Sequence, residues 1–142
     1  MDALAIARAC ADAMWADDVA SRALGMELIA VEPGHAVLAM NVTEEMVNGH
    51  DLCHGGYIFT LADSAFAFAC NTYNQRTVAQ HCQITYLTPG RLGMRLVAEA
   101  RERHRGDRSG IYDVTVRSQA GEAIAEFRGH TRLIPGTLVP EA

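Results

Sequence analysis

Hydrophobic side chains recur along this chain with two spacings, one typical of helices and one typical of strands. Apolar residues three to four positions apart predict helices over residues 2–23 and 56–71, and the second of these is the most apolar segment of the chain. Residues 25–42 alternate with a period of two around the turn pair Pro33-Gly34, which predicts two strands. Residues 43–53 are polar and predict a loop.

Four strand-like segments follow the second helix, separated by turn-forming residues: 77–87, 92–104, 109–119 and 122–134. The order of one helix, two strands, a buried helix and four strands predicts an α+β fold with a single antiparallel sheet. We expect one domain over residues 1–142, with its core at about 20–134 and a loosely held tail after Pro135.

Asp63 is the only charged residue between Gly55 and Cys70, in the middle of the apolar second helix. Both sides of this helix are apolar, so one side is expected to pack on its own sheet and the other on a partner subunit. A carboxylate in such a place carries a desolvation cost unless it is hydrogen-bonded. Asp63 is therefore either bonded to a nearby polar group and merely tolerated, or present for its chemistry.

The segment His54-Gly55-Gly56 stands at the start of this helix. The first N–H groups of a helix have no internal acceptor and lie at the positive end of its dipole, so they can stabilise a developing oxyanion. Helix geometry places Asp63 about 12 Å further along, which is too far for both groups to act on one carbonyl within one chain. Two antiparallel helices across a dimer interface would bring Gly55 of one chain near Asp63 of the other, which predicts a shared site.

The spacing of Asn48, Gly55 and Asp63 around an intact His-Gly-Gly, together with Ile84–Pro89 followed by Gly93, resembles the PaaI-type hotdog thioesterases named for phenylacetate degradation. The resemblance implies a hotdog fold, an antiparallel sheet wrapped around a long central helix, here with an extra N-terminal helix. It implies hydrolysis of acyl-coenzyme A (CoA) thioesters without a metal or bound cofactor, and the expected substrate is (hydroxy)phenylacetyl-CoA or a related aromatic acyl-CoA. It also implies homodimers that usually pair into homotetramers.

Carried over residue by residue, the resemblance makes Asp63 the general base or the nucleophile. Gly55 would donate its N–H to the thioester oxygen, and Gly56 would lie beside the substrate. Asn48 would polarise the carbonyl or hold the water, and His54 would support Asn48 and its loop.

One position departs from the family pattern. Some relatives have a Ser or Thr that helps to hold the water where this chain has Ala79. Thr60, Ser64 or His81 would then have to supply that contact.

The net charge of −5 argues against nucleic acid as the main partner. All 12 basic residues are arginines, so an anion site here must use arginine or backbone N–H groups. The densest cluster surrounds a predicted turn and comprises Arg101, Arg103, Arg105, Arg108 and Ser109. It is either a solvated hairpin or the site for the CoA phosphates, and the first three arginines are expected to share one strand face.

Other functions remain open at this stage. A Cys53-His54 nucleophile is disfavoured because adjacent loop residues rarely face each other. A metal site at His50, Cys53 and His54 lacks a second ligand group at convincing spacing. The alternatives to hydrolysis are an acyl-CoA dehydratase with His54 as its base and a non-catalytic acyl-CoA-binding protein.

The chain shows neither a signal-peptide pattern nor an apolar run long enough to cross a membrane. We read its four cysteines as reduced, which predicts a cytoplasmic protein with no membrane partner.

Overall fold

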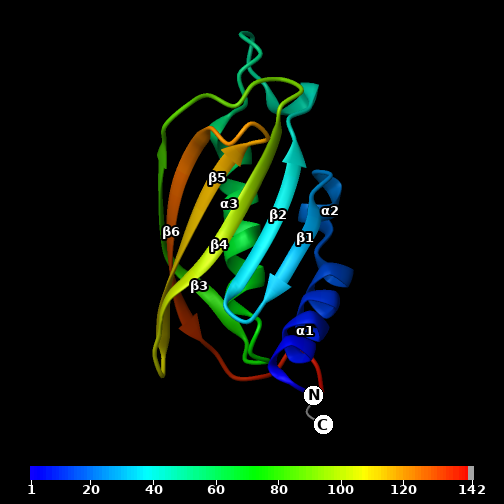
Figure 1. Cartoon of the computed structure of the whole chain (residues 1–142), viewed down its shortest axis with the longest axis vertical. Coiled ribbons are helices and arrows are strands. Elements are labelled where there is room, and N and C mark those ends of the chain that lie inside the picture. The colour runs from blue at the N-terminus through cyan, green and yellow to red at the C-terminus, as the bar shows by residue number, and fades with distance from the viewer. Residues whose placement is uncertain (141–142) are drawn as a thin grey trace.

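A computed structural model describes residues 1–140 and shows one antiparallel sheet of six strands (Figure 1). The strands are β1 (Glu27–Glu32), β2 (His35–Asn41), β3 (Thr77–Tyr86), β4 (Arg95–Arg105), β5 (Ser109–Ser118) and β6 (Ala123–Leu133). Their order across the sheet is β1-β2-β4-β5-β6-β3. The two strands before the central helix and the four after it lie where the alternating pattern predicts them, and β1 and β3 form the two edges.

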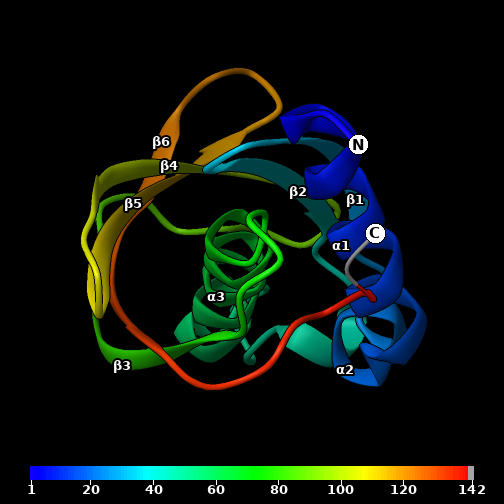
Figure 2. The ribbon, with the colours of Figure 1, turned by 90° about the horizontal axis from the view of Figure 1, so that it is seen from below.

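Helix α3 (Gly55–Cys70) lies in the concave face of the curved sheet (Figure 2). Its Phe66 packs against Tyr112 of β5 and Phe127 of β6, with ring centroids 5.9 and 5.6 Å apart. Gly129 of β6 allows this close packing, because a Cβ atom there would lie 2.5 Å from the Phe66 ring. The predicted antiparallel sheet wrapped around a long central helix is confirmed.

The N-terminal segment forms two helices, α1 (Ala3–Asp17) and α2 (Val19–Ala23), rather than the single helix predicted over residues 2–23. The break comes at Asp18, whose carboxylate accepts hydrogen bonds from the Ser21 N–H (3.0 Å) and the Ser21 hydroxyl (2.7 Å). A side chain that caps a helix N-terminus in this way starts a new helix, and the apolar spacing does not reveal that. Trp15 of α1 packs on Phe68 of α3 as core, with ring centroids 6.0 Å apart.

The C-terminal segment is held against the fold, so the prediction of a loose tail after Pro135 is wrong for residues 135–140. The N–H groups of Leu138 and Val139 both donate to the side-chain oxygen of Asn74 at 3.0 Å. The Asn74 amide in turn donates to the Val139 carbonyl at 3.1 Å. Residues 141 and 142 lie outside the described part of the chain.

The two sheet edges differ in how they are covered. Helix α1 lies along β1, whereas within residues 1–140 no further strand pairs with the outer edge of β3 (Figure 1). Most side chains of β3 are exposed, among them Val78 (42%) and Tyr86 (49%). An uncovered edge presents free N–H and C=O groups and is a template for pairing with another chain.

None of the helices in residues 1–140 has the length and apolar character that crossing a membrane requires.

Candidate active site

Asp63 lies in the wall of a pocket of about 500 Å³ between α3, the start of β3 and the two ends of the chain. Burial, and then the nearby Asp18 carboxylate, raise the pKa of Asp63 above its ordinary value. No hydrogen bond or ion pair within residues 1–140 compensates its charge. A carboxylate with a raised pKa in the wall of a pocket is typical of a functional group.

Helix α3 begins at Gly55, and the residue before it, His54, has an extended backbone and no side-chain cap. The Tyr57 N–H bonds back to the His54 carbonyl at 3.1 Å, while the N–H groups of Gly55 and Gly56 meet no acceptor in the described chain. Two adjacent backbone donors thus remain available at the positive end of the helix dipole. This is the arrangement that oxyanion stabilisation requires.

Tyr86 fixes this helix start, and the sequence did not single it out as a functional residue. Its hydroxyl donates to the Gly55 carbonyl at 2.8 Å. A Cβ on Gly55 would lie 2.7 Å from the Tyr86 ring, whereas one on Gly56 would meet open space. The packing of Tyr86 therefore requires glycine at position 55. Tyr86 lies 31 residues away in the sequence, so the residues next to Gly55 do not reveal this contact.

Asn48 lies in a tight turn before α3, and its side-chain oxygen is already used. It accepts from the N–H groups of His50 (2.9 Å) and Leu52 (3.2 Å), which leaves the Asn48 amide N–H₂ free to donate. Such a donor can polarise a substrate carbonyl. His54 holds the same loop through its backbone, whose N–H donates to the Met46 carbonyl at 2.8 Å, and its imidazole makes no hydrogen bond to Asn48 within residues 1–140.

The two halves of the predicted site lie in different pockets of the chain. Gly55 lines a second pocket of about 370 Å³ with Tyr86, Leu87 and Pro89, and Asp63 is not part of it. This separation agrees with the rise of about 12 Å between Gly55 and Asp63 along α3. Within one chain, Asp63 and the unbonded N–H groups at the start of α3 therefore do not converge on one point.

Ala79 lines the same pocket as Asp63, so the position without the expected hydroxyl does lie at the site. The Thr60 hydroxyl donates to the Gly56 carbonyl of its own helix at 2.8 Å. The Ser64 hydroxyl is buried against that of Ser21, also at 2.8 Å.

His81 is the third residue expected to replace the missing hydroxyl at Ala79. Its ring packs edge to face on the ring of His130, with centroids 5.4 Å apart. Sequence reasoning overlooked Thr77, which precedes Ala79 by two residues and lines the pocket with it.

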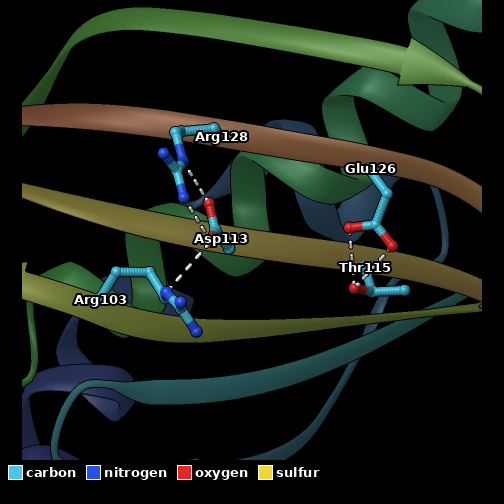
Figure 3. Close-up of polar contacts among 5 residues, drawn as sticks. All are labelled: Arg103, Asp113, Thr115, Glu126 and Arg128. Atoms are coloured by element: carbon cyan, nitrogen blue, oxygen red, sulfur yellow. Dashed lines mark hydrogen bonds and ion pairs between the residues drawn. The ribbon is translucent and has the colours of Figure 1, made fainter.

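The arginine cluster is already engaged in part. Arg101 pairs with Glu99 at 2.8 Å. Arg103 approaches Asp113 at 3.3 Å, and Asp113 also accepts two bonds from Arg128, at 2.6 and 2.9 Å (Figure 3). Arg101 and Arg103 therefore balance carboxylates on the outer face of the sheet.

Arg105 lies on the other face, so the prediction that it shares a face with Arg101 and Arg103 is wrong. The pairing register of β4 shifts between Glu102 and His104, and such a bulge reverses the alternation of side chains beyond it. The Arg105 guanidinium stacks on the ring of Tyr73 at 3.8 Å.

Arg108 and Ser109 lie at the adjoining turn, exposed, and no ion pair within residues 1–140 involves Arg108. The turn between β4 and β5 is at the end of the molecule where α3 ends, opposite the start of α3 (Figure 1).

The alternative chemistries find little support in the geometry. The Cys53 thiol donates to the His54 carbonyl at 3.5 Å, and burial raises the pKa of Cys53, so a reactive thiolate is disfavoured. The part of the chain that the structure describes contains no group of three His, Cys, Asp or Glu side chains placed to hold a metal ion.

Comparison with known proteins places the chain in a family. A family model described as "Thioesterase superfamily" matches residues 50–125. The chain is 45% identical over 132 residues to the acyl-coenzyme A thioesterase PaaI of Escherichia coli K12, which covers 93% of this chain and 94% of that protein.

Solved structures agree with this assignment. The E. coli PaaI protein from the phenylacetic acid degradation operon superposes with a TM-score of 0.94 at 43% identity, covering 96% of this chain and 99% of that one. A variant of the phenylacetic acid degradation protein PaaI from Thermus thermophilus gives 0.77 at 37% identity, over 80% and 97% of the two chains. The resemblance noted from the sequence is confirmed: this chain belongs to the thioesterase superfamily and, within it, to the PaaI-type acyl-CoA thioesterases of the hotdog fold.

Proposed function

We propose that this protein hydrolyses acyl-CoA thioesters to the free acid and CoA, with Asp63 as the catalytic carboxylate. The observation that carries the proposal is Asp63 itself, which lies in the wall of a pocket and has no ion-pair partner among residues 1–140. Burial raises the pKa of this carboxyl group. Family membership supplies the reaction class. Phenylacetyl-CoA or a ring-hydroxylated form is the proposed substrate, because the E. coli relative comes from a phenylacetic acid degradation operon.

The open edge of β3 supports a homodimer. If two copies pair antiparallel along β3, a two-fold axis relates them and their α3 helices run antiparallel across the interface. The oxyanion half of one protomer then approaches Asp63 of the other, so the dimer holds two composite sites. We further propose that such dimers pair into a tetramer, as the family resemblance implies.

The chemistry follows from these groups. Asp63 takes a proton from a water molecule as the water oxygen bonds to the thioester carbon. The negative charge that develops on the carbonyl oxygen is stabilised by the Gly55 N–H of the partner subunit, assisted by the Asn48 amide. The tetrahedral intermediate then collapses, the C–S bond breaks, and the thiolate of CoA leaves and is protonated. No step requires a metal or a bound cofactor.

Asp63 acting as nucleophile would instead form a mixed anhydride, which water then hydrolyses. A single turnover in H₂¹⁸O tests the nucleophilic route. Label in the Asp63 carboxyl would show nucleophilic attack followed by addition of water to the aspartyl carbon, whereas general-base catalysis never labels Asp63.

Among the arginines, we assign the CoA phosphates to Arg105 and Arg108 of the adjoining turn. Arg108 has no ion-pair partner in the described chain, and Arg105 stacks on a tyrosine rather than on a carboxylate. Guanidinium groups bind phosphate oxygens in a bidentate manner. We also propose a cytoplasmic location, on the basis of the four free cysteines expected from the sequence.

Release of free thiol from a panel of acyl-CoAs tests the reaction class. We expect thiol release from phenylacetyl-CoA and benzoyl-CoA. A dehydratase would change the acyl group without releasing thiol, and a binding protein would show saturable binding without turnover. Either result would overturn hydrolysis.

Complementation between two inactive variants tests the shared site. Asp63→Asn damages one half of each site, and Gly55→Val damages the other. In the co-expressed mixture, a heterodimer carries both changes in one site and leaves the other intact. Random pairing should restore roughly a quarter of the wild-type sites in a two-fold dimer. Activity no higher than that of the separate variants would contradict a shared site.

A further inference from the structure

The pocket beside Asp63 is enclosed by the two ends of the chain. Part of its apolar lining comes from β3, and the rest comes from α1, α3 and the C-terminal segment, among them Ala13, Met14, Phe66, Cys70, Ile134 and Leu138. Its volume of about 500 Å³ lies in the range of small-molecule pockets, roughly 300–1,000 Å³. Two of the segments that line it, α1 and the C-terminal segment, lie outside residues 50–125, the part of the chain that the family model matches.

A single asparagine ties these two ends together. Asn74 follows α3 with a left-handed backbone, φ +56°, which asparagine adopts more readily than most residues. Its side chain makes three hydrogen bonds to the backbone of Leu138 and Val139, as described above. The Cys10 thiol of α1 also points to the Asn74 oxygen, at 3.8 Å. The position of Leu138 in the pocket wall therefore depends on Asn74.

We propose that Met14 of α1 and Leu138 of the C-terminal segment select the acyl group, and that Asn74 is the positioning residue that holds Leu138 in place. This inference rests on the proposed function, in that the pocket containing Asp63 receives the acyl part of the thioester. A ring attached to the acyl carbon reaches past Asp63 and packs against these side chains. An acetyl group is too short to reach them. The two chain ends thus contribute to the binding of large acyl groups and not to the binding of small ones.

Binding of non-hydrolysable thioethers tests this directly in the full chain. Calorimetry would compare S-(2-phenylethyl)-CoA with S-ethyl-CoA. Leu138→Ala and Asn74→Gly should each weaken binding of the phenylethyl ligand by about 10-fold, the lower end of the discrimination that apolar pockets achieve. Binding of the ethyl ligand should stay within about 2-fold. Glycine at position 74 keeps the left-handed backbone and removes only the side-chain contacts.

Matched controls separate the wall from the general fold. Asn74→Asp keeps the oxygen that accepts from Leu138 and Val139 and should retain most of the preference for the phenylethyl ligand. Pro140→Ala lies beyond the residues that Asn74 holds and should change neither ligand. Leu138→Trp, which fills the pocket instead of opening it, should also exclude the phenylethyl ligand selectively, so the test does not depend on a loss of packing.

Equal weakening of both ligands, unchanged binding in the Leu138 variants, or a wild type that binds both ligands equally would overturn the inference. These measurements need no turnover. If the protein showed the predicted binding selectivity but released no thiol, the proposed hydrolysis would be wrong and the assignment of the acyl pocket would still hold.

Discussion

Asp63 and Asp113 are both partly buried carboxylates, and the protein treats them in opposite ways. Asp113, on the outer face of the sheet, is paired with Arg128 and Arg103, and the hydrogen bonds from Arg128 are the main cause that lowers its pKa (Figure 3). Asp63, in the pocket that α3 lines, has no such partner in the part of the chain that the structure describes, and burial raises its pKa. A compensated charge such as Asp113 serves the fold, whereas a carboxylate with a raised pKa in a pocket is typical of a functional group, in line with the role proposed for Asp63.

The two carboxylates also affect stability in opposite directions with pH. The folded-state pKa of Asp113 is lowered, so its contribution is present above the unfolded-state pKa and is lost as pH falls through the folded value. The folded-state pKa of Asp63 is raised, so the folded protein binds this proton more tightly than the unfolded chain does. The free energy of unfolding therefore declines as pH rises from the unfolded-state pKa through the folded-state pKa. The ionised form of Asp63 therefore lowers the stability of the fold.

Removing each of the two charges in turn should have the largest effect. Asp63→Asn should lower kcat by at least about 10²-fold, since a positioned base contributes roughly 10²–10⁴. Its midpoint of thermal unfolding at neutral pH should be unchanged or higher, because the buried charge is gone. Asp113→Asn should leave kcat unchanged and lower the free energy of unfolding by about 1 kcal/mol or less, as for a surface pair. Near-native turnover by a folded Asp63→Asn enzyme would remove this residue from the mechanism.

A second comparison sets the two glycines at the start of α3 against each other. Gly55→Ala places a Cβ against the Tyr86 ring. Overpacking of this kind costs about 1–3 kcal/mol of stability, and the displaced N–H should lower kcat by roughly 10-fold. Gly56→Ala meets open space in the chain and should be neutral or gain up to about 1 kcal/mol from helix propensity. Equal destabilisation in chemical denaturation would show that the Tyr86 contact does not decide the residue at position 55.

The arginines at the turn should act on binding alone. Replacing Arg105 and Arg108 with Gln should raise KM for acyl-CoA several-fold and weaken its salt dependence. It should leave kcat nearly unchanged, because phosphates far from the reacting carbon are bound about equally in the ground and transition states. A short thioester without the nucleotide serves as the control substrate. Equal losses on both substrates would assign the cluster to the fold, and no loss on either would make it a solvated hairpin.

The smallest expected effect is a shift in the pKa of Asp63 caused by a substitution at a neighbouring residue. The acid limb of kcat/KM should follow Asp63, so activity is lost as pH falls through its raised pKa. Asp18→Asn removes a like charge and should move that limb to lower pH, while the plateau at higher pH stays the same. Asparagine retains a side-chain oxygen that can cap α2. A limb that does not move would show that burial alone sets the pKa of Asp63.

Several elements of this molecule follow from local sequence alone. The period-two segments became β1 to β6, and the apolar segment after His54 became α3, because the periodicity of burial is written in adjacent residues. Asp63 stood out for the same reason, as one charge in a helix apolar on both sides. Its role, like those of Gly55 and Asn48, remains a prediction.

Only the tertiary structure decided the features that depend on distant partners. The bulge in β4 that turns Arg105 to the other face depends on how β4 pairs with β5. The tail is held by Asn74, far away in the sequence, and the same contact brings the C-terminal segment to the pocket wall beside α1. Such contacts carry no signal in neighbouring residues, because register and chain closure are properties of the whole sheet and of the helix that it wraps.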